Sequence, residues 1–215
     1  MHRRHSLAQT VTAWALALAD GAAAESSGNF SPCLNESTTL NAPFENDCGA
    51  YSAAGLKHIE LWFAKPRNQS WEPSRVASLL RQHGLTPVSA CASGDSLGRQ
   101  QGDIESHLQQ EFEMCQALDI PRYIVFSSIG DKIEQDDYKV ATGRFVKLAE
   151  LAARYHVGIA FEFIARSALI GSLVTSLRVL REARQPNTGI CLDTFHFFVA
   201  VSKFEDLDQH PSGRD

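Results

Sequence analysis

A carboxylate and an imidazole lie three residues apart at the end of a short apolar run near the C-terminus. Residues 189–192 are of strand type, and Asp193 and His196 follow them. A strand buried on both faces is apolar along its length and becomes polar only where it leaves the core. Ligands of α/β folds bind at such strand ends, so Asp193 and His196 are candidates for chemistry. The alternative is that Asp193 caps the next helix and His196 lies on its surface.

A second carboxylate, Glu162, lies near the end of the apolar run 157–163, 31 positions before Asp193. If the two runs are neighbouring parallel strands, about 5 Å apart, their carboxylates can converge. Two oxygen ligands beside an imidazole suit Mn²⁺, Mg²⁺ or Co²⁺, with Zn²⁺ a weaker candidate. Such an ion would polarise a sugar carbonyl and its neighbouring hydroxyl, while a carboxylate removes and returns the carbon-bound proton. Such a site permits epimerisation or aldose–ketose isomerisation through an enediolate.

Strand-like and helix-like segments alternate along the chain from residue 30 onward. Strands are expected at 30–34, 58–63, 85–92, 122–126, 157–163 and 189–193, and helices at about 44–54, 73–83, 104–118, 135–155 and 171–183. A strand every 30 residues or so indicates βα units with parallel strands. No glycine-rich phosphate-binding fingerprint follows any strand. Polar residues at nearly every strand end favour a TIM-type barrel over a doubly wound sheet.

The predicted fold is therefore α/β, a parallel (β/α) TIM-type barrel with about six of its eight βα units present. A full barrel typically has about 250 residues, and we place a partial barrel domain at 30–215 of this 215-residue chain. An unfinished barrel exposes strand edges and inner faces, so we expect self-association or marginal stability.

Residues 1–29 differ in composition and are expected to lie outside the fold. They begin with a basic segment containing Arg3 and Arg4, continue with an apolar run at 11–19, and carry small residues at 22–24. Two interpretations stay open: a twin-arginine-like signal for export to the periplasm, or a disordered leader on a cytoplasmic protein. The apolar run is too short for a membrane span.

Composition narrows the classes of partner. The net charge is −5 and the pI about 5.9, which disfavours nucleic acid as the main partner, because duplex binding depends on lysine and arginine. The five cysteines are scattered, odd in number and without a CxxC pair. Neither a disulfide framework nor a cysteine zinc site is indicated.

Three stretches together resemble the xylose isomerase-like TIM barrels, and most closely the sugar phosphate isomerase/epimerase family. Residues 189–198, with Asp193 and His196, resemble the sixth-strand motif of that family. Residues 159–163 resemble its fifth strand, which ends in a metal-binding glutamate, and residues 54–62 resemble its AG-x-x-x-IE second strand. The resemblance extends over about residues 30–207.

The resemblance implies a metal-dependent enzyme that acts on a sugar, sugar phosphate or polyol. Glu162 and Asp193 would be metal ligands, Glu162 would also serve as a base, and His196 would orient a substrate oxygen beside the metal. Intact relatives are often oligomeric, so a homo-oligomer is expected. At the second strand end, Glu60 either contacts substrate or caps or pairs locally, and Trp62 either walls a sugar pocket or lies at the core edge.

The sequence also departs from the family. A histidine of the seventh strand and a glutamate of the eighth complete the family's metal site, and neither has a counterpart, since His210 lies in a loop-like setting. We therefore expect impaired activity. A non-catalytic remnant or binding module of the same fold stays open, as does an inosose dehydratase-like lyase. An abasic-site endonuclease-like barrel is disfavoured, because it would need histidines where Ser93 and Ser127 occur.

Overall fold

The computed structural model contains one parallel sheet whose strands follow their order in the sequence. The structure describes residues 31–68, 71–97, 104–127 and 133–209; the leader at 1–29 and His210 lie outside them. The strands are β1 (Cys33–Asn35), β2 (His58–Trp62), β3 (Thr86–Cys91), β4 (Arg122–Phe126), β5 (Gly158–Glu162) and β6 (Thr188–Cys191). Each strand is hydrogen-bonded to its neighbour in sequence, which confirms the barrel-type parallel architecture.

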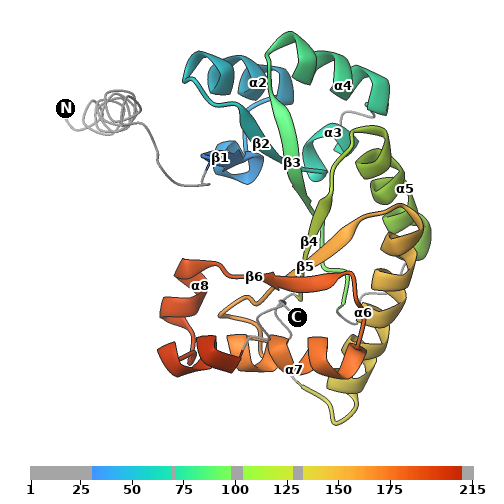
Figure 1. Cartoon of the computed structure of the whole chain (residues 1–215), viewed down its shortest axis with the longest axis vertical. Helices are drawn as coiled ribbons and strands as arrows, with labels where there is room; N and C mark the ends of the chain where they lie inside the picture. The colour runs from blue at the N-terminus through green and yellow to red at the C-terminus, as the bar shows by residue number, and fades with distance from the viewer. Residues whose placement is uncertain (1–30, 69–70, 98–103, 128–132, 210–215) are drawn as a thin grey trace, which may run out of the picture.

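The helices between the strands follow one another around one side of the curved sheet, and two short helices come after the last strand (Figure 1). They are α2 (Phe44–Ala53), α3 (Ala64–Asn68), α4 (Pro73–Gln82), α5 (Ile104–Ala117), α6 (Asp137–Arg154), α7 (Leu173–Ala183) and α8 (Thr194–Val199), with 3₁₀ helices η1 (Glu36–Thr39) and η2 (Phe204–Gln209). The five longer helices were expected from their apolar spacing or from Pro and Gly at their ends. The short elements α3, η1 and η2 were not, because so few residues carry no readable period.

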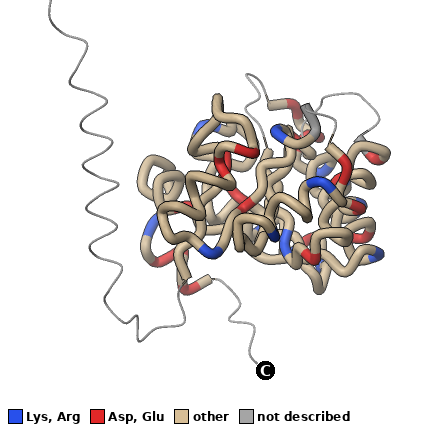
Figure 2. The backbone as a smooth tube through the Cα atoms, turned by 90° about the horizontal axis from the view of Figure 1, so that it is seen from above, with Lys and Arg blue, Asp and Glu red and all other residues tan. Residues whose placement is uncertain are grey.

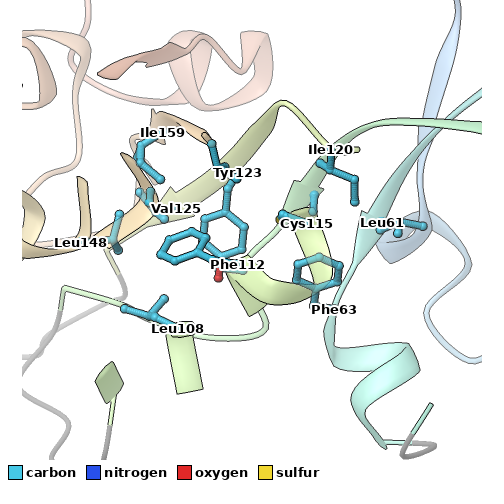
Figure 3. Close-up of a cluster of buried hydrophobic side chains, with 14 of the residues drawn as sticks. Leu61, Phe63, Leu108, Phe112, Cys115, Ile120, Tyr123, Val125, Leu148 and Ile159 are labelled. Atoms are coloured by element: carbon cyan, nitrogen blue, oxygen red, sulfur yellow. The ribbon is translucent and has the colours of Figure 1, made fainter. Parts of the chain in front are cut away.

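The hydrophobic core lies between the sheet and these helices (Figure 3). Phe145 of α6 packs on Phe161 of β5, with ring centroids 5.3 Å apart. Phe112 of α5 meets Tyr123 of β4 edge to face at 5.0 Å. Because side chains alternate along a strand, Glu162, which follows Phe161 in β5, faces the opposite side of the sheet. The polar residues of the sheet are thereby gathered on one concave surface.

Charged residues are distributed over the helices throughout the described part of the chain. Figure 2 shows lysine and arginine interspersed with aspartate and glutamate rather than gathered on a single face. None of the described helices combines the length and apolarity that a membrane crossing requires.

A buried polar clamp fixes the loop after β1 to the end of β2. Lys65 of α3 forms a buried salt bridge with Asp47 of α2 and donates to the carbonyl of Thr39 at 2.9 Å. Glu36 is fully buried, and its Oε2 accepts the backbone N–H of Trp62 at 2.9 Å. The pKa of Glu36 is raised to about 8, because burial and the nearby Asp47 outweigh the opposing effects of the Trp62 N–H and Lys65.

Replacing Glu36 with glutamine should flatten the pH dependence of stability. The pKa of Glu36 is above its ordinary 4.5 in the folded chain, so its stabilising contribution is complete below about pH 4.5 and is lost as the pH rises through 8. Between pH 5 and 8, the unfolding free energy from urea titration should fall by about 1–3 kcal/mol less in Glu36→Gln than in the wild type. Glu45→Gln, at a half-exposed site paired with Arg75, is the control, and parallel pH profiles for Glu36→Gln and the wild type would contradict the assignment.

Candidate metal centre

Two carboxylates and an imidazole converge at the C-terminal ends of β5 and β6. Glu162 is the last residue of β5 and is paired in register with Cys191, the last residue of β6. Asp193 follows two positions later, and His196 lies in the first turn of α8. One potential ligand atom from each of Glu162, Asp193 and His196 lies within 4.8 Å of the other two. The structure thus brings together the three residues that the sequence selected.

Asp193 has a second task, which is to begin α8. Its backbone is extended, and its Oδ1 accepts the backbone N–H of His196 at 2.8 Å, as an N-cap residue does. The helix-cap alternative and the site interpretation therefore both describe this residue. The cap fixes the orientation of the carboxylate and places His196 beside it.

The ring of His196 is oriented by the loop after β5. Its Nδ1 accepts the backbone N–H of Ala165 in a long hydrogen bond of 3.4 Å. A neutral imidazole has one N–H, so with Nδ1 accepting, the proton resides on Nε2. In this arrangement His196 is suited to donate a hydrogen bond to a ligand oxygen, and the two carboxylates are the stronger candidates for holding a metal ion.

The site is electrostatically negative. Burial, together with the carboxylates of Asp193 and Glu60, raises the pKa of Glu162 to about 7. Burial and the same three carboxylates raise the pKa of the Cys191 thiol to about 12. A divalent cation would relieve this repulsion, and carboxylate oxygens are the donors that hard divalent cations accept. The donor set therefore fits a divalent metal.

Glu60 is held by the strands on either side of it. It lies in register with Asn35 of β1 and Ser89 of β3, and both side chains donate hydrogen bonds to its carboxylate. This three-strand bridge accounts for the orientation of Glu60 without a lysine partner. Sequence reasoning missed Ser89; the available signal was a serine inside a strand, on the concave face two residues before the strand end.

Trp62 and its neighbours differ in burial. Trp62 is partly exposed and alternates with Leu61, which places it on the same face as Glu60. Phe63 is 2% exposed and packs near Tyr123, with ring centroids 6.1 Å apart, so it belongs to the core. Glu36 is fully buried in the clamp described above and is not a pocket residue.

All five cysteines are free thiols, in agreement with the absence of a disulfide framework. Cys91 and Cys191 end strands β3 and β6 and are partly buried. Burial, with Glu60 and Glu162, raises the pKa of Cys91 well above its ordinary range. These thiols are therefore protonated near neutral pH and are poor metal ligands.

Similarity to known proteins agrees with this geometry. An inosose isomerase of Bacillus velezensis is 24% identical over 189 residues, which cover 82% of this chain and 67% of that protein. The solved structure of an IolI protein with a bound zinc atom has a TM-score of 0.74 at 22% identity, covering 84% of this chain and 68% of that one. A D-allulose 3-epimerase from Methylomonas sp., solved with D-allulose, has a TM-score of 0.62 at 18% identity, covering 73% and 58%.

These similarities leave about a third of the relatives' length unmatched. At such low identity the solved structures establish the fold alone. The family assignment comes from a separate match: residues 48–211 fit the model of the xylose isomerase-like TIM barrel. That region includes β2 to β6 and all three residues of the candidate metal centre. The chain belongs to the xylose isomerase-like TIM barrel family.

Proposed function

We propose that this chain carries the metal and proton-transfer site of an isomerase or epimerase acting on a small sugar, sugar phosphate or polyol. The observation that supports this most directly is the convergence of Glu162, Asp193 and His196 within 4.8 Å at two adjacent strand ends. The relatives include an inosose isomerase and a D-allulose 3-epimerase. Reactions of this class move a proton next to a carbonyl group.

Each site residue has a role that follows from its position. Glu162 and Asp193 would hold the ion, which when bound supplies polarisation of a carbonyl and its neighbouring hydroxyl. Glu162, at the end of β5, would also accept and return a carbon-bound proton, through an enediolate. His196 donates from Nε2 to a substrate oxygen, while Glu60 and Trp62 contact substrate from the same concave face.

The described residues also explain why we expect weak activity. The two carboxylates supply only part of the about six ligands that Mg²⁺ or Mn²⁺ takes, so water or substrate would have to fill the rest of the coordination shell. Mn²⁺, Mg²⁺ and Co²⁺ are the metals that this donor set favours, and Zn²⁺ belongs in the same test because the IolI protein contains zinc. A sugar-binding module without turnover is the alternative, and an assay for proton exchange separates the two.

Metal binding should depend on the carboxylate pair. In calorimetric titrations with Mn²⁺ and Zn²⁺, Glu162→Gln and Asp193→Asn should each weaken affinity at least tenfold, because each removes a negatively charged ligand. Asparagine can still cap a helix, so Asp193→Asn should retain α8. Glu205→Gln, at an exposed position of η2, is the matched control. Unchanged affinity in both site variants would exclude a metal at this position.

Metal affinity should fall as the pH is lowered through 7. Protons compete with the metal for Glu162, whose pKa is about 7 in the metal-free chain, so affinity should drop about tenfold per pH unit below that value. Glu60→Gln removes a negative charge that raises the pKa of Glu162. The pH at which metal affinity begins to fall should therefore be lower in this variant. Calorimetry from pH 5.5 to 8.5 measures both effects; a flat profile over that range would contradict protonation of Glu162 near neutrality.

Replacing His196 should slow proton exchange of the substrate without weakening metal binding. His196→Ala should leave Mn²⁺ affinity within about threefold, since its Nε2 carries a proton in this arrangement. The same variant should lose at least about tenfold in solvent-deuterium incorporation into ketoses and inososes, followed by NMR. If metal affinity falls in parallel with exchange, His196 is a ligand. If wild-type chain with bound metal exchanges no substrate proton, the binding-module alternative holds.

A further inference from the structure

A cavity apart from the candidate metal centre lies where α5 faces the segment between β2 and α4. Its volume is about 400 Å³, which is within the range of small-molecule sites. Apolar and acidic side chains line it together; among them are Phe63, Trp71, Glu72, Glu111, Glu113 and Met114. None of the three residues of the candidate metal centre is among the described residues that line this cavity.

Glu111 is the buried acid of this cavity, with an exposed fraction of 5%. Its Oε2 accepts the phenol O–H of Tyr123, a core residue (Figure 3). Its Oε1 receives no hydrogen bond from the described part of the chain. A buried carboxylate oxygen without a donor is unfavourable, and a ligand that donates a hydrogen bond to it would remove that penalty.

The imidazole of His107 does not satisfy this oxygen. Its Nε2 lies 3.2 Å from Oε1 of Glu111, one turn further along α5, but the ring N–H does not point at that oxygen. The same Nε2 is 2.7 Å from Oγ of Ser93. The contact with Glu111 becomes an ion pair only when the ring is protonated. With a neutral ring, Oε1 of Glu111 is left for another donor.

Two further carboxylates stand at the rim of the cavity, both exposed. Glu72 is the residue before α4, yet its side chain does not cap that helix. Glu113 accepts a hydrogen bond from Gln109 at 3.0 Å through Oε1. Neither carboxylate forms a salt bridge among the residues that the structure describes. Three acidic side chains around one cavity favour a positively charged occupant.

The occupant favoured by this arrangement is an organic cation rather than a bare metal ion. A metal ion needs three or more ligand atoms close together, and in the described parts of the chain only the candidate metal centre provides such a group. The acids of this cavity are instead spread around apolar walls. Phe63, at the edge of the core, and Met114 of α5 supply those walls, and they suit an alkyl chain.

Trp71 adds an aromatic surface that already attracts a cation. The guanidinium of Arg75 lies 4.5 Å from the centroid of the Trp71 ring, and it also pairs with Glu45 at 2.8 Å. Arg75 does not belong to the cavity lining. The negative potential of this part of the surface is thus only partly compensated by the chain itself.

We propose that this cavity binds a primary alkylammonium cation. The ammonium group donates to Oε1 of Glu111, and the alkyl chain lies against Phe63 and Met114. A primary ammonium is favoured over a quaternary one, because only an N–H group can satisfy the buried oxygen, in a charge-assisted hydrogen bond. This binding goes beyond the proposed reaction and does not depend on it.

Titration of the full chain with n-butylammonium, followed by NMR, tests the proposal. The indole N–H of Trp71 should shift with a dissociation constant of about 1 mM or lower. n-Butanol, which has the shape without the charge, should bind at least tenfold more weakly, and so should tetramethylammonium, which has the charge without an N–H. The indole of Trp62, on the concave face with Glu60, reports any binding at the candidate metal centre.

Two variants locate the ammonium group. Glu111→Gln should weaken n-butylammonium binding at least tenfold, since it removes the buried charge. The double variant Glu72→Gln/Glu113→Gln changes exposed positions only and should weaken binding about threefold or more; it carries the test if Glu111→Gln does not fold. Glu205→Gln, an exposed acid of η2 away from the cavity, is the matched control and should bind as the wild type does.

Three outcomes would overturn the proposal. The first is no shift of Trp71 up to about 10 mM n-butylammonium. The second is equal affinity for n-butanol, which would make the cavity an unspecific apolar site. The third is a shift confined to Trp62, which would place the cation at the candidate metal centre.

Discussion

The candidate centre depends on one pairing, the parallel register between β5 and β6. Glu162, the last residue of β5, lies opposite Cys191, the last residue of β6. Asp193 follows Cys191 by two residues and so lies just beyond the level at which β5 ends. A shift by one residue would turn Glu162 into the apolar core and Phe161 onto the concave face. The packing of Phe161 on Phe145 opposes that shift, so the hydrophobic core on one side of the sheet fixes the carboxylates on the other.

Sequence alone gave most of the architecture, for identifiable physical reasons. The six strands are apolar runs at regular spacing, and helices such as α6 repeat apolar residues on one face; both patterns are local. The pair Asp193 and His196 was found because polar residues interrupt a buried strand only at its end. Convergence with Glu162 required one further assumption, that consecutive strands are neighbours, and the structure bears this out.

Other features could not be predicted, because they depend on contacts between distant segments. Glu36 belongs to no sequence motif, yet its carboxylate accepts the backbone N–H of Trp62 across 26 positions and is fully buried. Ser89 carries no motif, and its role appears only when β1, β2 and β3 stand side by side around Glu60. The tautomer of His196 is likewise set by a backbone amide, which no side-chain pattern encodes.

The double role of Asp193 affects what its retention in related sequences can say about activity. Its carboxylate both joins the metal cluster and starts α8, so selection for folding alone would retain an acid or amide here after any ion had been lost. Its persistence in a lineage is therefore poor evidence of turnover. Within the described part of the chain Glu162 caps no helix, so after loss of the ion the first replacements should accumulate at that position.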